Sequence, residues 1–347
     1  MSTSVLGTSA DDPLVTIAIP TFNRASWLRD CVVAALAQSY KNFEIVVSDN
    51  ASTDETGEML REFHDPRLRV VRQERNIGLI PNWNACLAEA KGDYIVFVSD
   101  DDRVAPWLLE RCIALLRLDP QIPIVIALSD VHFVAEAQTW RAPPSPTLRA
   151  GICDGADILH EFLKDRISAT MCSIVFRTNR LRARGGLSVD LPYAGDMASW
   201  APLLLEGKAG FINESCASFA IHSGSQTSKS AVNIRINDGH KVVELIANTT
   251  ARSISDPQKR IAIMLDAQRY FARRVVALLA SHRREGAKFR DVAPLIWEYR
   301  RDFTHIGIRN MLKLARPLAI LFLPEPITRC IRSLTRVSLL RGRAPRI

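Results

Sequence analysis

The sequence contains no paired-cysteine motif and no apolar run long enough to span a membrane. Its seven cysteines are an odd number and none forms a C-x-x-C pair, which disfavours structural zinc and a disulfide framework and is typical of a reducing cytoplasm. The longest apolar stretch near the C-terminus, residues 317–323, is far shorter than the roughly 18 residues that a spanning helix needs. Residues 1–12 are polar, without the apolar core of a signal peptide. We therefore expect a cytoplasmic protein, either soluble or attached at a membrane surface.

The first predicted strand, residues 14–19, is not followed by a glycine-rich loop. Without G-x-G-x-x-G at this point, a dinucleotide-binding dehydrogenase is disfavoured. Residues 19–24 contain no glycine at all, which also disfavours a sugar-phosphate nucleotidyltransferase. The net charge of +8, from 45 basic and 37 acidic residues, suits an anionic partner such as a nucleotide, a phospholipid surface or a nucleic acid. No DNA- or RNA-binding motif accompanies this charge, so nucleic acid is the least supported of the three.

Short apolar, β-rich segments alternate with helical periods through the first hundred residues. Strands are predicted at residues 14–19, 43–47, 68–71 and 94–98, with helices at 26–38, 55–63 and 81–90 between them. This alternation predicts an α/β fold, with a mostly parallel, Rossmann-like sheet covered by helices on both faces. Beyond about residue 231 helical periods dominate, which predicts a helical C-terminal extension.

Polar residues follow each of these four strands. In open α/β sheets, ligands bind outside the carboxyl ends of the strands. The sequence therefore predicts that one rim of the sheet brings together Thr21, Asp49, Asn76 and the Asp100–Asp102 triplet.

The densest of these clusters is the segment Y-I-V-F-V-S-D-D-D-R at residues 94–103, where an apolar strand ends in three adjacent carboxylates. Three neighbouring anions repel one another, so a positive partner is expected, and a divalent cation bound to phosphate oxygens is the natural candidate. The alternative is a solvated turn in which Asp102 caps a helix that starts near Pro106.

Six segments carry a resemblance to a known family. They are I-P-T-F-N-R at 19–24, V-S-D-N-A-S-T-D at 47–54, R-N-I-G at 75–78, S-D-D-D-R-V-A-P at 99–106, G-D-M-A-S-W at 195–200 and H-S-G-S at 222–225. In this order, and with the first four each after a predicted strand, they resemble the family 2 glycosyltransferases over roughly residues 13–228. Two features depart from the family pattern. Gly195-Asp196 stands where many relatives have Glu-Asp, and the Q-x-x-R-W motif of processive members is absent, which argues for transfer of one sugar at a time.

The resemblance implies a GT-A fold, also called the nucleotide-diphospho-sugar transferase fold. We expect a flexible tail at 1–12, a GT-A domain at 13–230 and a helical extension at 231–347. Within the GT-A domain, residues 13–105 would form the nucleotide-binding half and residues 106–230 the acceptor-binding half. The implied activity is inverting transfer from a UDP- or dTDP-sugar, with Mg²⁺ or Mn²⁺, to a glycan or lipid-linked acceptor in polysaccharide or glycolipid synthesis. The rival hypothesis is a non-catalytic module that keeps the fold.

The resemblance also implies donor-binding residues. Asp101 would bind the metal that bridges the donor diphosphate, with Asp102 assisting and His222 contacting the metal or the diphosphate. Asp100 would lie near the ribose or share the cation, and Asp49 would accept a hydrogen bond from the nucleobase. An Asx-turn is the alternative for Asp49, and an exposed or structural role the alternative for His222. Further residues implied in the donor pocket are Pro20, Thr21, Asn23, Arg24, Asn76 and Gly78; for Gly78 a turn without a ligand is equally compatible.

Asp196 is the implied catalytic base. A carboxylate on the acceptor side would deprotonate the acceptor hydroxyl before it attacks the anomeric carbon. The alternative is a helix N-cap at the start of the segment 196–206.

The C-terminus carries a basic amphipathic pattern. Ile327, Ile331, Leu334, Val337 and Leu340 recur at helical spacing, and Arg329, Arg332 and Arg336 fall on the other side. Such a helix suits an anionic membrane surface at the inner face of the membrane. A helix packed on the catalytic domain, or a dimer contact, is the other reading.

Overall fold

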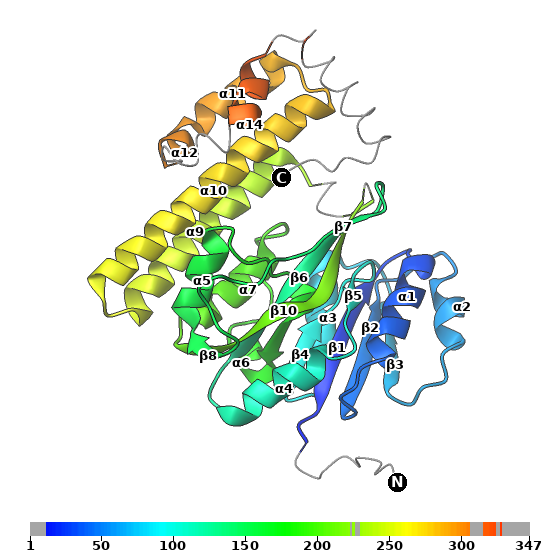
Figure 1. Cartoon of the computed structure of the whole chain (residues 1–347). Helices are drawn as coiled ribbons and strands as arrows, with labels where there is room; N and C mark the ends of the chain where they lie inside the picture. Colours follow the sequence, from blue (N-terminus) through cyan, green and yellow to red (C-terminus); the bar gives the residue numbers. More distant parts are fainter. Residues whose placement is uncertain (1–11, 223, 226–229, 306–314, 324–326, 328–347) are drawn as a thin grey trace. The chain divides into compact units, whose positions relative to one another are not determined.

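The computed structural model describes residues 12–222, 224–225, 230–305, 315–323 and 327. These residues form two compact units. The first comprises the chain up to residue 132 together with 140–158 and 166–220, and the second comprises 133–139, 159–165 and the chain after residue 220. Figure 1 shows the two units, with the sheet in the first and long helices in the second.

The sheet has the strand order β3-β2-β1-β4-β9-β6-β10-β5. The strands β1 (Val15–Thr21), β2 (Phe43–Asp49), β3 (Leu68–Arg72) and β4 (Tyr94–Phe97) run parallel. Ile17 is in register with Ile45 on one side and with Val96 on the other. The parallel sheet predicted for the first hundred residues is therefore confirmed.

Four further pairs in the sheet are antiparallel. Strand β9 (Ile174–Arg177) pairs with β4 and with β6 (Ile124–Phe133), while β10 (Lys208–Ile221) pairs with β5 (Arg103–Val104) and β8 (Gly151–Asp154). A short strand, β7 (Gln138–Trp140), pairs with β6. The sheet is thus mixed, with its parallel half made by the N-terminal β-α repeats.

Helices cover both faces of the parallel strands. On one face α1 (Ala25–Leu36), α2 (Thr56–Arg61) and α4 (Leu108–Leu118) pack on the side chains of Val15, Ile17 and Ile19. On the other face α3 (Leu79–Glu89) packs on β1 and β2, and its Trp83 ring stacks on Phe97 with centroids 5.4 Å apart. Alternate residues of β1 are buried on opposite faces, which is why its sequence is apolar without interruption.

The second half of the sheet is accompanied by shorter elements. These are α5 (Gly155–Leu163), the 3₁₀ turn Met171–Ser173, α6 (Thr178–Ala183) and α7 (Gly195–Leu204).

The second unit is helical, as the sequence predicts. It contains α9 (Val232–Ser253), α10 (Pro257–Glu285), α11 (Phe289–Glu298), α12 (Arg300–His305) and α14 (Ala315–Phe322). Helix α10 begins where the Asp256 carboxylate accepts a hydrogen bond from the Gln258 amide, and it ends at Gly286, whose φ of 129° suits glycine. Its own apolar cluster includes Ile236, Val276 and Leu279.

Within the residues that the structure describes, no helix is both long and apolar enough to cross a bilayer. The predicted basic helix at the C-terminus lies outside the described residues, apart from Ile327, and its membrane role stays a prediction.

Candidate functional site

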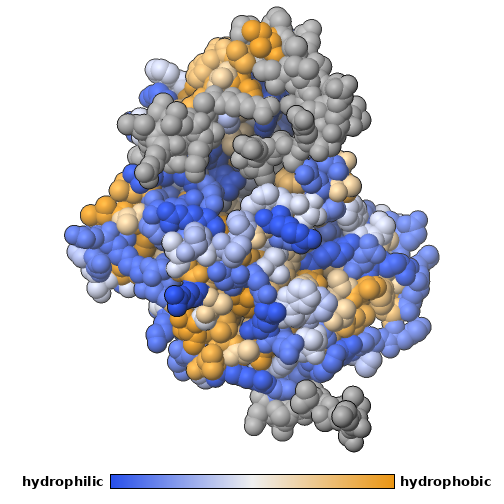
Figure 2. Space-filling model, in the orientation of Figure 1, coloured by the Kyte–Doolittle hydropathy of each residue, from blue (hydrophilic) through white to orange (hydrophobic). Residues whose placement is uncertain are grey.

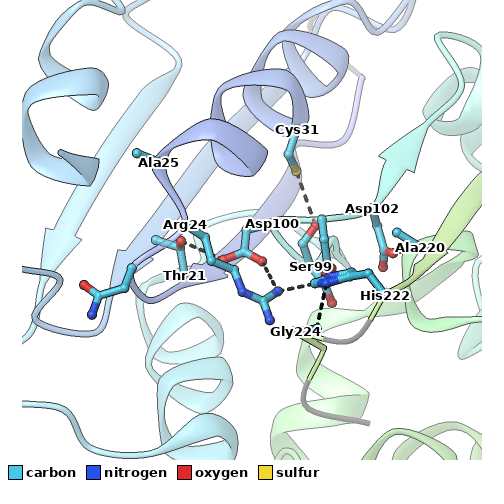
Figure 3. Close-up of polar contacts among 12 residues, drawn as sticks. Thr21, Arg24, Ala25, Cys31, Ser99, Asp100, Asp102, Ala220, His222 and Gly224 are labelled. Atoms are coloured by element: carbon cyan, nitrogen blue, oxygen red, sulfur yellow. Dashed lines mark hydrogen bonds and ion pairs between the residues drawn. The ribbon is translucent and has the colours of Figure 1, made fainter. Parts of the chain in front are cut away.

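The ends of β1 and β4 are joined by a buried hydrogen bond. The Thr21 hydroxyl, at the last position of β1, donates to Asp100 Oδ2 at 2.8 Å. Asp100 follows β4 and is 4 % exposed. Figure 3 shows Thr21, at the end of β1, and Arg24, from the loop that follows, both directed at Asp100. The structure therefore brings together residues that the sequence only placed at neighbouring strand ends.

Arg24 supplies the positive charge expected beside the acidic triplet. Its Nη1 donates to Asp100 Oδ1 at 2.9 Å and to Asp101 Oδ2 at 2.7 Å. The arginine side chain is 23 % exposed, while both carboxylates are buried. One guanidinium thus offsets the repulsion between two adjacent carboxylates, which would otherwise be costly to bury.

Burial raises the pKa of Asp100 from 3.8 to about 6, although the charge of Arg24 and the hydroxyl of Thr21 oppose this rise. Burial also raises the pKa of Asp102 well above its usual value, with the neighbouring charge of Asp101 adding to the effect. An added cation would favour the ionised form of both carboxyl groups.

Asp102 has a different environment from its two neighbours. Its Oδ1 accepts a hydrogen bond from the Ala220 amide of β10 at 2.9 Å. Helix α4 begins at Leu108, with Trp107 at the N-cap position and no side-chain cap. The alternative in which Asp102 caps the helix near Pro106 is therefore wrong, because its carboxylate faces a strand that is remote in sequence.

The donor set fits a hard divalent cation only in part. Carboxylate oxygens are the ligands that Mg²⁺ and Mn²⁺ prefer, and Mg²⁺ sites commonly use one or two carboxylates together with substrate phosphates and water. Asp100 and Asp101 supply such a pair. Among the described residues, no three His, Cys, Asp or Glu side chains are grouped to hold a metal ion by themselves. The remaining ligands would come from a bound diphosphate and water.

Asp49 ends β2 and is held by two interactions. Its Oδ1 accepts from the Ser52 amide at 2.9 Å, which is the turn-type contact given above as the alternative, and its Oδ2 accepts from Arg72 Nη1 at 2.6 Å. Arg72 also donates to the Ser52 carbonyl. The sequence analysis missed Arg72. The parallel register of β2 and β3, which pairs Asp49 with Arg72, was the signal that could have found it.

Asn50 is a second residue that the sequence analysis missed. Its amide nitrogen donates to Asn76 Oδ1 at 3.0 Å and to the Gly78 carbonyl at 3.2 Å, while its oxygen accepts from the Ile77 amide. Gly78 has a φ of 92° and precedes α3, so a side chain there would be strained. Asn76 and Gly78 thus shape the loop beside β2.

The loop after β1 is tied to the loop after β2. Asn23, with a φ of 52°, accepts at Oδ1 from the Thr53 amide at 2.7 Å, and its own amide donates to Ser52 Oγ at 2.9 Å. Pro20 is buried in β1 in register with Ser48. This edge of the sheet therefore brings together Pro20, Thr21, Asn23 and Arg24.

Asp196 lies in the first turn of α7, after the N-cap position at Ala194. Its Oδ1 accepts from the Met197 amide at 2.6 Å. As a residue Asp196 is exposed to solvent, yet desolvation by the atoms packed around its carboxyl group raises the pKa of that group. The N-cap alternative is therefore wrong in position. The role of Asp196 as catalytic base stays a prediction.

Gly195 explains part of the departure from the family pattern. A Cβ atom at this position would lie 3.3 Å from Ile80 Cδ1 and 3.4 Å from the Ser188 carbonyl oxygen. A side chain at residue 195 would therefore need Ile80 to shift.

His222 belongs to the second unit, where its Nδ1 accepts a hydrogen bond from the Gly224 amide at 3.2 Å. Its contact with a metal or a diphosphate stays a prediction.

Comparison with known proteins identifies the family. Residues 16–183 match the model of "Glycosyl transferase family 2". An uncharacterized protein of Mycobacterium tuberculosis is 35 % identical over 61 % of this chain and 68 % of its own length. Hyaluronan synthase of Pasteurella multocida is 26 % identical over 68 % of this chain, and the match spans only 23 % of that larger protein. The chain belongs to glycosyl transferase family 2.

Solved structures show the same fold. S. aureus TarS in complex with UDP-GlcNAc superposes with a TM-score of 0.58 at 17 % identity, over 84 % of this chain and 89 % of that one. The mannosyltransferase PcManGT from Pyrobaculum calidifontis, in complex with GDP-Man and Mn²⁺, gives 0.53 at 18 % identity, over 94 % of this chain and 88 % of that one. The expected GT-A fold is confirmed.

Proposed function

We propose that this chain transfers a single sugar, with inversion, from a UDP- or dTDP-sugar to a glycan or lipid-linked acceptor in cell-surface polysaccharide or glycolipid synthesis. The observation that carries the proposal is the cluster of Thr21, Arg24, Asp100 and Asp101 at the carboxyl ends of β1 and β4. Buried carboxylates held by one arginine are suited to recognising a diphosphate and its cation. A cluster that served only to stabilise the fold would not require three adjacent acidic residues.

In this proposal Asp101, together with Asp100, holds Mg²⁺ or Mn²⁺, which would neutralise charge on the departing nucleoside diphosphate. Arg24 is assigned to the diphosphate oxygens, because guanidinium groups bind phosphate in a fixed geometry. Asp49 accepts a hydrogen bond from the nucleobase N–H, and its ion pair with Arg72 fixes its orientation. The loop at Asn76 and Gly78 borders the same pocket.

Asp196 is the proposed base. It takes the proton from the acceptor hydroxyl, whose oxygen forms the new bond to the anomeric carbon. The bond from that carbon to the diphosphate oxygen breaks on the opposite face, so the configuration inverts. The first-turn position of Asp196 in α7 keeps its carboxylate at the solvent-facing start of the helix.

The comparisons support parts of this proposal. TarS is described with UDP-GlcNAc, and PcManGT with GDP-Man and Mn²⁺. Two relatives are named as synthases of hyaluronan and chondroitin, and both are much longer than this chain. A nucleotide-sugar donor, a divalent cation and a glycan product are therefore the natural first assumptions for this chain.

A non-catalytic sugar-nucleotide module is the second candidate, favoured by Gly195 in place of an acid. The two are separated by a thermal-shift panel of UDP-, dTDP-, GDP- and CDP-sugars, each with and without Mn²⁺, followed by turnover with the stabilising donor. Manganese-dependent stabilisation by one nucleotide, with sugar transfer or slow donor hydrolysis, supports the enzyme. Stabilisation without turnover supports the module, and no stabilisation by any donor contradicts both.

A further inference from the structure

Helix α11 is apolar on two faces. Val292 is buried in the second unit's core, where Leu295 and Ile296 also pack. A second stripe on α11, the outer stripe, contains Phe289, Ala293 and Trp297 at i, i+4 and i+8. Together with Ile296 and with Arg300 of α12, these residues line a hollow of about 210 Å³.

The outer stripe exposes large aromatic side chains. Trp297 is 70 % exposed and Phe289 is 43 % exposed, and on the adjacent helix α14 Phe322 is 61 % exposed. Figure 2 shows apolar side chains gathered over this end of the second unit. Large exposed apolar groups that recur on one surface mark an interaction site, since scattered single residues are the ordinary case.

Cations lie against these rings. The Arg300 guanidinium is 4.4 Å from the Trp297 ring centroid. Arg283, whose guanidinium is 5.9 Å from the Phe289 ring, is buried and donates to the carbonyls of Ala287 and Leu323, so it is not a cation of the surface. Arg290 projects beside them with a side chain 78 % exposed, although the exposed acids Asp291 and Glu298 also lie on α11. Aromatic rings edged by arginines match the boundary between lipid headgroups and acyl chains, where Trp is enriched and Arg can bind phosphate.

The charge of this region favours a lipid surface over a neutral partner. Residues 231–347 contain 23 of the 45 Lys and Arg but only 9 of the 37 Asp and Glu. The excess of basic residues therefore falls wholly in the C-terminal third, and the rest of the chain is net acidic. A positively charged surface with protruding aromatic rings is complementary to an anionic bilayer.

We infer that the outer stripe of α11, with Phe289 and Trp297 as its inserting residues, binds the surface of an anionic membrane. This inference adds a partner to the proposed function and does not depend on sugar transfer. Its inserting residues lie on α11 and not on the predicted basic helix at 327–340, although the arginines of that segment add to the charge counted above.

The test is co-sedimentation of the full chain with sucrose-loaded vesicles. Equal parts of phosphatidylcholine and phosphatidylglycerol are compared with phosphatidylcholine alone, at low and high salt. We expect binding to the anionic vesicles that weakens with salt, and a loss of about tenfold or more in the double variant Phe289→Ala/Trp297→Ala. Trp297→Phe should retain most of the binding. Trp140→Ala, which removes an exposed tryptophan outside α11, is the matched control and should bind as the parent does.

Absence of vesicle binding by the parent chain overturns the inference, as does equal binding by the parent and the double variant. A parent that forms a dimer, with no lipid binding and with dissociation in the double variant, shows instead that the stripe is a protein contact and also overturns it. Thermal unfolding checks that the double variant is folded. Donor-induced stabilisation of the same samples reports separately on the proposed function, so either can fail alone.

Discussion

The hydroxyl of Thr21 and the carboxylate of Asp100 meet at 2.8 Å although 79 residues separate them in the chain. This hydrogen bond links the ends of β1 and β4 and stabilises a carboxylate that Arg24 also binds.

Thr21→Val removes the donor to Asp100 but keeps the shape of the side chain. A buried carboxylate without this hydrogen bond is less stable in its charged form, so we expect a loss of about 1–3 kcal/mol in the free energy of unfolding. Manganese-dependent donor binding should weaken as well. Urea unfolding and donor titration measure the two effects, and Thr21→Ser is the control that should behave as the parent. Equal stability of Thr21→Val and the parent would contradict the structural role.

Arg24→Gln leaves Asp100 and Asp101 without their shared guanidinium. The two buried carboxylates then repel without compensation, so the apo protein should lose about 2 kcal/mol or more. Because the variant has more to gain from a cation, Mn²⁺ should raise its melting temperature further than it raises that of the parent. Melting curves with and without Mn²⁺ give this difference. A smaller manganese effect in the variant would show that Asp100 and Asp101 are not cation ligands.

The pH dependence of cation binding follows from Asp100. Its pKa is about 6 in the folded protein and 3.8 ordinarily, so the folded state holds this proton more tightly than the unfolded state. Without a cation, stability attributable to Asp100 therefore falls as pH rises from about 4 to about 6. A bound cation favours the ionised form, so stabilisation by Mn²⁺ should grow between about pH 5 and about pH 7. Melting temperatures across this range measure it, and the pH dependence should be weaker in Asp100→Asn, where the raised pKa of Asp102 still contributes.

Asp196→Asn should separate catalysis from binding. If Asp196 is the base, turnover falls by about 10²–10⁴-fold, while donor-induced stabilisation stays close to that of the parent. The nearby exposed Asp190→Asn is a matched control, because it removes a carboxylate close to α7 and should retain turnover. Comparable activity in Asp196→Asn and the parent removes Asp196 from the mechanism.

Asp49→Asn tests recognition of the nucleobase. Asparagine can still accept from the Ser52 amide, but it loses the charged pair with Arg72. If Asp49 contacts the base, the variant should bind UDP and CDP more equally than the parent does. Arg72→Gln weakens the same ion pair and leaves the carboxylate in place, so it should retain the preference. Affinities by calorimetry decide, and an unchanged preference in Asp49→Asn would remove Asp49 from recognition of the base.

Sequence periodicity was sufficient for the parallel half of the fold. Each of the first four strands is an apolar run followed by polar residues, and local pattern alone shows where such a strand ends. In the second half the sequence also predicts strands, at residues 122–134, 169–176 and 211–221, where the structure has β6, β9 and β10, but it does not predict their antiparallel pairing. Pairing of β9 with β4 depends on contacts between segments about 80 residues apart, which no local pattern encodes.

The sequence by itself determined which side chains stand at the carboxyl ends of the strands, because a strand end is a local property of the chain. Thr21, Asp49 and Asp100 were all found in this way. Only the tertiary structure decided their partners: that Arg24 bridges Asp100 and Asp101, that Arg72 holds Asp49, and that Asp102 turns to Ala220 of β10. A hydrogen bond depends on distance and direction in space. Those are set when the sheet brings separate loops together.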